Sequence, residues 1–180
     1  MPEVSQEQSA QTATYASTRA GQQVGDGECY ALADQALKAA GAKSADSYGK
    51  ITATADYVWG DKVAVTAARA GDVIQFKDYT VTIETTTKVV NADGSWDERT
   101  QIETMSRPHH TAVVAQPNST GDVGVYEQNV NGSRAVQNNK LQFVSRDEAP
   151  VSTTVNGTTT TVTKKVKVTG TAQFYRPQVK

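Results

Sequence analysis

The chain has 180 residues, of which 37% are apolar, and its 18 basic and 19 acidic side chains give a formal net charge of −1. This near-neutral balance, with no block of like charge, argues against a nucleic-acid-binding protein, and the length suits one domain with a substantial core. A single cysteine excludes an intramolecular disulfide, and no apolar run reaches the roughly 20 residues of a membrane span.

Residues 1–20 are rich in Gln, Ser, Thr and Ala and show little periodicity. This composition predicts a flexible N-terminal arm or a frayed helix, followed by a single domain at residues 21–180. The same segment lacks the apolar stretch of a secretory signal peptide.

The only cysteine, Cys29, follows a glycine-rich turn at residues 24–28. It begins a stretch in which small and apolar residues recur at helical spacing, and we predict a helix with Asp26 as its N-cap and Gly41 just after its end. The unpaired N–H groups and dipole of a helix start favour a thiolate, so this position suits a nucleophile. The alternative is that Cys29 is a buried, small apolar side chain.

Residues 44–60 are predicted to form a second helix, with an apolar face made of Ile51, Ala55, Val58 and Trp59. The chain then becomes rich in Thr and Val, which is typical of strands. We predict short strands at residues 73–76, 110–115, 123–130 and 171–175. Helices followed by antiparallel strands indicate an α+β fold.

Two long hairpins are predicted within this β region, at residues 78–105 and 151–168. The first turns at residues 91–94, and the second turns at Asn156-Gly157, a strong two-residue hairpin signal. They are either extensions of the sheet, arms that reach a partner, or plain solvated strands. Their edge strands could pair with another chain, so a dimer stays open.

A thiol nucleophile needs a base, because a thiol at its reference pKa of about 8.5 is only a few per cent ionised at neutral pH. The only two histidines, His109 and His110, are adjacent at the start of a predicted strand, so only one can readily face the Cys29 helix. Two alternatives are a surface pair and a zinc site, although one cysteine and two adjacent histidines lack the usual ligand spacing.

The base in turn needs an acceptor that orients its ring. Alternation along the next strand puts Glu127 and Asn129 on one face, where both could approach the imidazole of His110. A carboxylate or amide oxygen there would fix the tautomer and stabilise the imidazolium. The alternative is that both residues only decorate a solvated face of the sheet.

The sequence stretches around Cys29, His110 and Glu127 together resemble the CHAP and NlpC/P60 group of papain-like cysteine amidases and peptidases. The similarity is carried by the cysteine after its glycine turn, Ala-Gly-Asp-Val-Ile-Gln-Phe, His-Thr-Ala-Val-Val and Glu-Gln-Asn-Val-Asn-Gly. It implies a papain-like fold with N-terminal helices packed on an antiparallel sheet, to which the two hairpins are additions. It also implies Cys29 as nucleophile, His110 as base, and Glu127 and Asn129 as third and fourth members.

The resemblance further implies an oxyanion-hole candidate, Gln23, because papain-like enzymes place a glutamine six residues before the cysteine. Segments rich in aspartate, with which some CHAP enzymes bind calcium, are absent before Cys29, so we expect no metal and no cofactor.

The substrate that the resemblance implies is a peptide of bacterial peptidoglycan, cleaved at an amide bond by a lysin or an antibacterial toxin. Such a protein would be made in the cytoplasm, would act in the periplasm or outside the cell after non-classical export, and could have an immunity or inhibitor protein as a partner. One alternative is a protease, deamidase or transglutaminase that acts on a protein. A second alternative is a non-catalytic binding module on the same fold.

Overall fold

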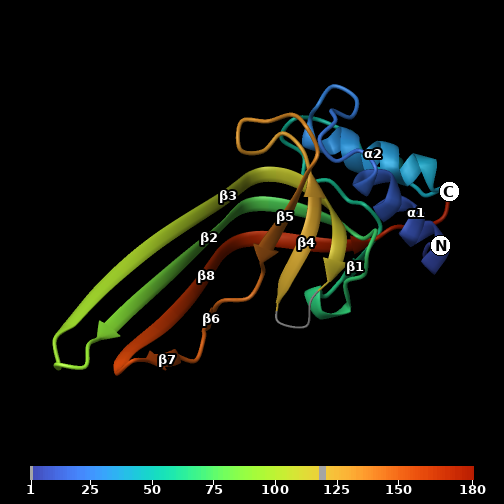
Figure 1. Ribbon diagram of the computed structural model, residues 1–180. Coiled ribbons are helices and arrows are strands. Elements are labelled where there is room, and N and C mark those ends of the chain that lie inside the picture. The colour runs from blue at the N-terminus through green and yellow to red at the C-terminus, as the bar shows by residue number, and fades with distance from the viewer. Residues whose placement is uncertain (1, 118–120) are drawn as a thin grey trace.

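A computed structural model describes residues 2–117 and 121–180 as two helices beside one antiparallel sheet, part of which extends as a long curved arm (Figure 1). The α+β class predicted from the sequence is therefore observed. The elements, in chain order, are α1 (Gln6–Ser17), α2 (Cys29–Ala39), the 3₁₀ turn η1 (Ala45–Ser47), β1 (Asp61–Val63), the 3₁₀ turn η2 (Val65–Ala67), β2 (Val73–Val90), β3 (Trp96–Pro117), β4 (Asp122–Glu127), β5 (Gln137–Gln142), β6 (Arg146–Asp147), β7 (Val151–Val155) and β8 (Thr158–Arg176).

The sheet has the strand order β1-β8-β2-β3-β4-β5, with β6 and β7 paired to β8. Because the chain leaving β5 returns to β8 through β6, the sheet curls around a core of its own. In this core the ring of Phe143 packs on the rings of Phe76, Tyr79 and Phe174. The Tyr79 side chain extends across this core, and its hydroxyl donates to the Gln142 carbonyl at 2.6 Å.

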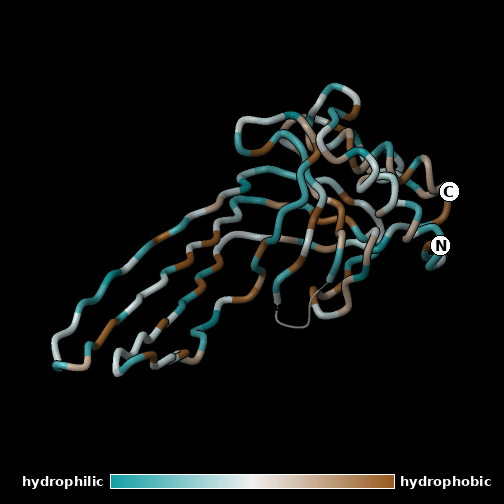
Figure 2. The backbone as a smooth tube through the Cα atoms, viewed as in Figure 1, coloured by the Kyte–Doolittle hydropathy of each residue, from teal (hydrophilic) through white to brown (hydrophobic). Residues whose placement is uncertain are grey.

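A second core lies between the sheet and the helices. Leu32 and Leu37 of α2 are fully buried there, together with Trp59, Val73 and Val113. Since β2 has a core on each face, its first four residues are all buried, and the sequence accordingly shows no alternation there. In Figure 2, apolar residues are frequent in the part of the sheet near the helices, whereas β3 is largely polar along the arm.

Of the flexible arm and the frayed helix that the composition of residues 1–20 left open, the structure shows a helix, α1 (Gln6–Ser17). Ser5 and Gln8 make a reciprocal capping box at its start, which satisfies two backbone N–H groups. Ser9, Thr12 and Ala16 are buried, so the face against α2 is made of small residues with little hydropathy contrast. Among the described residues, no helix is long and apolar enough to cross a membrane.

Residues 44–60 do not form the predicted second helix; only the three-residue turn η1 is helical. The segment is held by side-chain contacts that a regular helix would not make. Tyr57 donates to the Thr52 carbonyl at 2.7 Å, and the indole Nε1 of Trp59 donates to Gln75 Oε1 of β2 at 3.2 Å. Apolar residues at helical spacing therefore reach the core here from an irregular chain.

The two predicted hairpins turn where expected, and β2, β3 and β8 extend from them into the central sheet, whereas β7 ends at Val151. The register between β2 and β3 runs unbroken from Val73 opposite Val113 to Val90 opposite Trp96. The second hairpin joins β7 and β8 through Asn156 and Gly157, both with positive φ. The arm is thus a continuation of the strands that carry the core.

A β-bulge interrupts the pairing of β2 with β8 between Lys77 and Thr80. Asp78 has a φ of 51°, and Gly170 on β8 lies directly against it. A Cβ at position 170 would lie 2.1 Å from the Asp78 carbonyl oxygen, so only glycine fits. Such a bulge bends its strand and separates the arm from the sheet beside the helices.

Candidate active site

Cys29 is the first residue of α2, as predicted, and is partly exposed. The N-cap is Glu28 and not Asp26, and it makes no side-chain cap; the Asp26 carboxylate instead accepts a hydrogen bond from the Glu28 N–H at 3.0 Å. The turn before the helix is tightly packed, because a Cβ on Gly27 would lie 2.9 Å from side-chain atoms of Gln23 and Arg134. This turn delivers the thiol to the helix start, where backbone N–H groups have no intrahelical partner.

A buried amide holds the turn in place from the other side of the site. Gln128, fully buried, donates from Nε2 to the carbonyls of Val24 at 2.9 Å and Glu28 at 2.6 Å. Its Oε1 accepts from the Val24 N–H at 3.1 Å. Gln128 directly follows Glu127, the last residue of β4. Of these two neighbours, Gln128 holds the turn before Cys29 and Glu127 contacts His110.

His110 lies on β3 and is buried, and the neighbouring Cys29 is one of the groups that raise its pKa. Its Nε2 lies 2.9 Å from Glu127 Oε2, at ion-pair distance, although the contact is not aligned as a regular hydrogen bond. Catalytic contacts of this kind are often poorly aligned in the absence of substrate and tighten when it binds. With Nε2 at the carboxylate, Nδ1 is the nitrogen left for the thiol.

His109 points away from this pair. Its Nε2 is 2.7 Å from the Ala55 carbonyl oxygen, and its ring packs edge-on against Tyr57. Only one of the two histidines therefore reaches Cys29, in agreement with the alternation along the strand.

Glu127 is fully buried and is surrounded by donors. Arg107, also buried, donates from Nε to Oε2 at 2.8 Å and from Nη2 to Oε1 at 2.6 Å. Asn139 on β5 donates to Oε1 at 2.8 Å. Together with His110 on Oε2, these contacts leave the carboxylate fixed in position and well solvated by protein groups.

The charges of the site support one another. Burial opposes ionisation of Glu127, but the contacts with Arg107 and His110 outweigh it and hold the pKa of this carboxyl at about 2. Burial also lowers the pKa of His110, yet the contacts with Cys29 and Glu127 together raise it above its usual value. An ionised Glu127 behind a readily protonated His110 is the arrangement that stabilises a thiolate–imidazolium pair.

A comparison with known families bears on this arrangement of cysteine, histidine and glutamate. The sequence model of a family described as "AIM3/BBC1 Cysteine proteinase-fold domain" matches residues 1–148. The chain belongs to this family. No curated protein and no solved structure was found to match it. The family supports the papain-like cysteine proteinase fold, and the match includes all the site residues described above.

Two predicted site residues of this AIM3/BBC1 domain lie elsewhere. Asn129 is exposed, has a φ of 58°, and donates to the Glu28 carboxylate at 2.7 Å and not to His110. Because β4 ends at Glu127, the alternation that would place Asn129 beside Glu127 does not continue. Gln23 is also exposed, and its amide donates to the Gly25 carbonyl at 3.2 Å within its own turn.

Three supporting residues of the AIM3/BBC1 domain were not predicted: Arg107, Gln128 and Asn139. Arg107 stands among polar residues of a strand, and only the stagger of β3 against β4 brings it to Glu127. Gln128 is part of the Glu-Gln-Asn motif on which the resemblance rests. The motif could therefore have pointed to Gln128, although strand alternation does not.

Aromatic rings flank the thiol of the domain. Tyr57 packs against Tyr30, the residue after Cys29, with ring centroids 5.2 Å apart. Burial and the neighbouring Cys29 raise the pKa of Tyr57, so this hydroxyl stays neutral. Within the described residues, no group of three or more His, Cys, Asp or Glu side chains could hold a metal ion.

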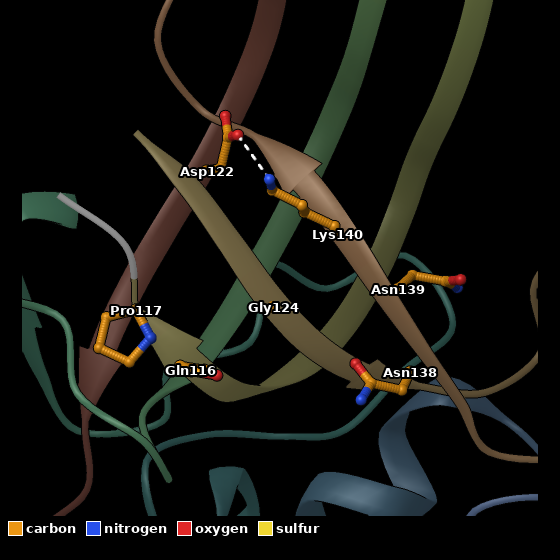
Figure 3. Close-up of a pocket in the computed structure, with 7 residues that line it drawn as sticks. All are labelled: Gln116, Pro117, Asp122, Gly124, Asn138, Asn139 and Lys140. Carbon is orange, nitrogen blue, oxygen red and sulfur yellow. Dashed lines mark ion pairs between the residues drawn. The ribbon is translucent and has the colours of Figure 1, made fainter. Parts of the chain in front are cut away.

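A hollow of about 740 Å³ lies on β3, β4 and β5 of the domain and is not centred on Cys29 (Figure 3). Lys140 pairs with Asp122 across it at 3.0 Å. Asn139 lines it and also donates to Glu127, so the hollow adjoins the acidic member of the site. None of the described residues that line the hollow is a nucleophile; they are Gln116, Pro117, Asp122, Gly124, Asn138, Asn139 and Lys140.

Proposed function

We propose that the protein is a cysteine hydrolase that cleaves amide bonds, with Cys29 as nucleophile, His110 as general base and acid, and Glu127 as the residue that orients His110. The observation that carries this proposal is the position of His110, which lies 2.9 Å from the buried Glu127 carboxylate and beside Cys29, the neighbour that contributes to its raised pKa. A thiol, an imidazole and a buried carboxylate in this order are the parts that nucleophilic catalysis at an acyl carbon requires.

The reaction follows from these positions. The Cys29 thiolate attacks the amide carbonyl carbon, and the backbone N–H of Cys29 at the start of α2 donates to the oxyanion. Protonated His110 gives its proton to the leaving amine as the C–N bond breaks. His110 then takes a proton from water, which attacks the thioester and releases Cys29 as thiolate.

For the substrate we propose a peptide of bacterial peptidoglycan, which places the protein's action outside the cytoplasm. The support is the similarity of the strings around Cys29, His110 and Glu127 to CHAP and NlpC/P60 enzymes. A protein substrate is the second candidate, and the observation that favours it is the arm, whose long strands offer a surface for a macromolecule.

The adjacent histidines supply a matched pair of variants for the test. Wild type, Cys29→Ala, His110→Gln and His109→Gln are incubated with soluble peptidoglycan fragments and with an unfolded protein, and the products are identified by mass spectrometry. We expect a product that requires Cys29 and His110 but not His109, and its mass identifies the bond that is cut. Cleavage of only the unfolded protein would move the proposal to protein substrates.

Alkylation of the only cysteine separates an enzyme from a binding module. Iodoacetamide should modify Cys29 of wild type rapidly at neutral pH and should modify the His110→Gln variant at least about ten times more slowly, because the thiolate loses its imidazolium partner. A thiol that is equally slow in both proteins, together with no cleavage of either substrate, would overturn the proposal in favour of a binding module.

A further inference from the structure

The outer edge of β3 is unpaired along the arm. β3 pairs with β2 over its whole arm segment, but it pairs with β4 only from Val113 to Pro117. Between Trp96 and Ser106 the other edge has no strand partner in the part of the chain that the structure describes. At Ser106 the carbonyl already accepts a hydrogen bond from Arg107 Nη1 at 2.8 Å, which marks the inner limit of the free edge. Such an edge is a template for another strand.

The side chains on this edge are complementary to themselves. Two copies that pair antiparallel about a two-fold axis normal to the sheet use the whole free edge when the axis passes through its middle residue, Gln101. In that register Arg99 of each copy lies opposite Glu103 of the other, so two ion pairs form across the axis. Both side chains are exposed and point to the same face of the strand.

Neighbouring registers lack this match. Residues that lie opposite each other in the pair must point to the same side of the sheet, so the two-fold axis must pass through a residue. The nearest alternative registers therefore have the axis at Thr100 or at Ile102. An axis at Thr100 places Asp97 opposite Glu103 twice, which brings like charges together. An axis at Ile102 places Arg99 opposite Met105 and removes both ion pairs. The charges therefore select the register that is centred on Gln101.

Two large apolar side chains on the other face of this edge are open to solvent. Trp96 is 63% exposed and Ile102 is 65% exposed. In the register centred on Gln101, each Ile102 lies opposite Thr100 of the second copy, and the two Ile102 side chains are diagonal neighbours across the axis. Pairing of the two edges thus covers an exposed apolar residue as well as the free backbone groups.

We propose that the chain forms a two-fold dimer by antiparallel pairing of residues 96–106 of β3 with the same residues of a second copy. The free backbone edge, the reciprocal Arg99 and Glu103 charges, and the exposed Ile102 support it independently of any catalytic activity.

Charge reversal on the full chain tests the side-chain register. Sedimentation equilibrium should find wild type as a dimer, whereas Arg99→Glu and Glu103→Arg each weaken dimerisation at least tenfold because like charges face each other twice. The double variant restores the pairs and should return to within threefold of wild type. A wild-type monomer at every concentration, or a double variant no better than the singles, would overturn the proposal.

Cysteine cross-linking tests which edge pairs, because Cys29→Ala leaves a chain without cysteine. In that background Gln101→Cys lies directly opposite its own copy, and oxidation should give a disulfide-linked dimer. Thr153→Cys is the matched control, since Thr153 is the middle residue of β7, whose outer edge is unpaired in the described chain. Rapid cross-linking at position 153 but not at position 101 would place the contact on β7 and overturn the proposal.

Discussion

Arg107 and Glu127 form a two-point ion pair inside the sheet, with Nε to Oε2 at 2.8 Å and Nη2 to Oε1 at 2.6 Å. Both side chains are at most 5% exposed. His110 contacts the same carboxylate oxygen that Arg107 Nε binds, so the guanidinium fixes the position of the group that orients the imidazole. Arg107 therefore acts on the site through Glu127, as a positioning residue.

Replacement of Arg107 by Met should leave the Glu127 carboxylate buried and without its main partner. We expect a loss of about 3–5 kcal/mol in the free energy of unfolding, measured in urea, because a buried charge then has no counter-charge. The same change should raise the pKa of Glu127. Arg107→Lys keeps the charge but not the planar two-point contact, so it should recover only part of the stability.

The pH dependence of cleavage distinguishes a positioning role of Arg107 from a purely structural one, because a loss of stability alone would not change it. The pH profile of cleavage should change in Arg107→Met, because Glu127 then supports protonated His110 less well. A profile identical to that of wild type, with only the amount of folded protein reduced, would give Arg107 a purely structural role.

Glu127→Gln and Asn129→Ala distinguish the two residues that the sequence places together. Glu127→Gln removes the negative charge that stabilises protonated His110, and turnover should fall by about 10²–10⁴-fold. Asn129→Ala removes only an exposed contact with Glu28, so turnover should fall by less than about threefold. Steady-state kinetics check both values, and a larger effect of Asn129→Ala would make Asn129 the orienting residue.

Much of this site follows from local rules. Cys29 was predicted because a glycine turn followed by helical spacing is visible in twelve or so neighbouring residues, and His110 and Glu127 were predicted because strands alternate. Alternation does not apply to Asn129, because β4 ends two residues earlier and the Asn129 backbone is left-handed, which no side-chain pattern indicates. Arg107 was missed because its partner depends on the stagger between two strands.

Local sequence patterns are also insufficient for two elements of the fold. For residues 1–20 the composition leaves a flexible arm and a frayed helix open, because the buried face of α1 is made of Ser, Thr and Ala, although the capping box between Ser5 and Gln8 is present in the sequence. The apolar spacing of residues 44–60 predicts a helix, because spacing alone does not tell a helix from an irregular segment that Trp59 and Tyr57 hold in place. In both cases tertiary contacts override hydropathy.

Acid should destabilise the protein through Glu127. The pKa of this carboxyl is about 2 in the folded chain and higher in the unfolded chain, so its ionised form contributes stability at higher pH and loses it as the pH falls through the range of about 4 to 2. His110, whose pKa is raised, is protonated in both states over this range and adds no slope.

Urea unfolding of wild type and Glu127→Gln between pH 2 and 5 measures the contribution of ionised Glu127 to the free energy of unfolding. The difference between the two proteins should shrink as the pH falls, because wild type loses a contribution that the variant lacks from the start. A constant difference across the range would mean that Glu127 is not held ionised by Arg107.

Gln128→Ala should loosen the turn that carries Cys29. The buried Val24 N–H and two carbonyls would lose their partner, at a cost of about 1–3 kcal/mol for the unpaired N–H alone. We expect slower turnover and slower alkylation of Cys29, with the pKa of His110, followed by NMR, moving down as the thiol contact weakens. Unchanged alkylation would show that the turn keeps its place without this amide.

The bulge at the base of the arm leaves no room for a side chain at Gly170. Gly170→Ala adds a Cβ that would lie 2.1 Å from the Asp78 carbonyl oxygen, and it also forces a left-handed backbone on alanine. Gly94→Ala in the β2–β3 turn carries the same backbone penalty, of about 1–2 kcal/mol, but its Cβ would meet no atom within 4 Å. In urea unfolding Gly170→Ala should therefore cost at least about 3 kcal/mol and clearly more than Gly94→Ala. Equal losses in the two variants would mean that the strands at the bulge move apart freely, so that the arm is not held at a fixed angle.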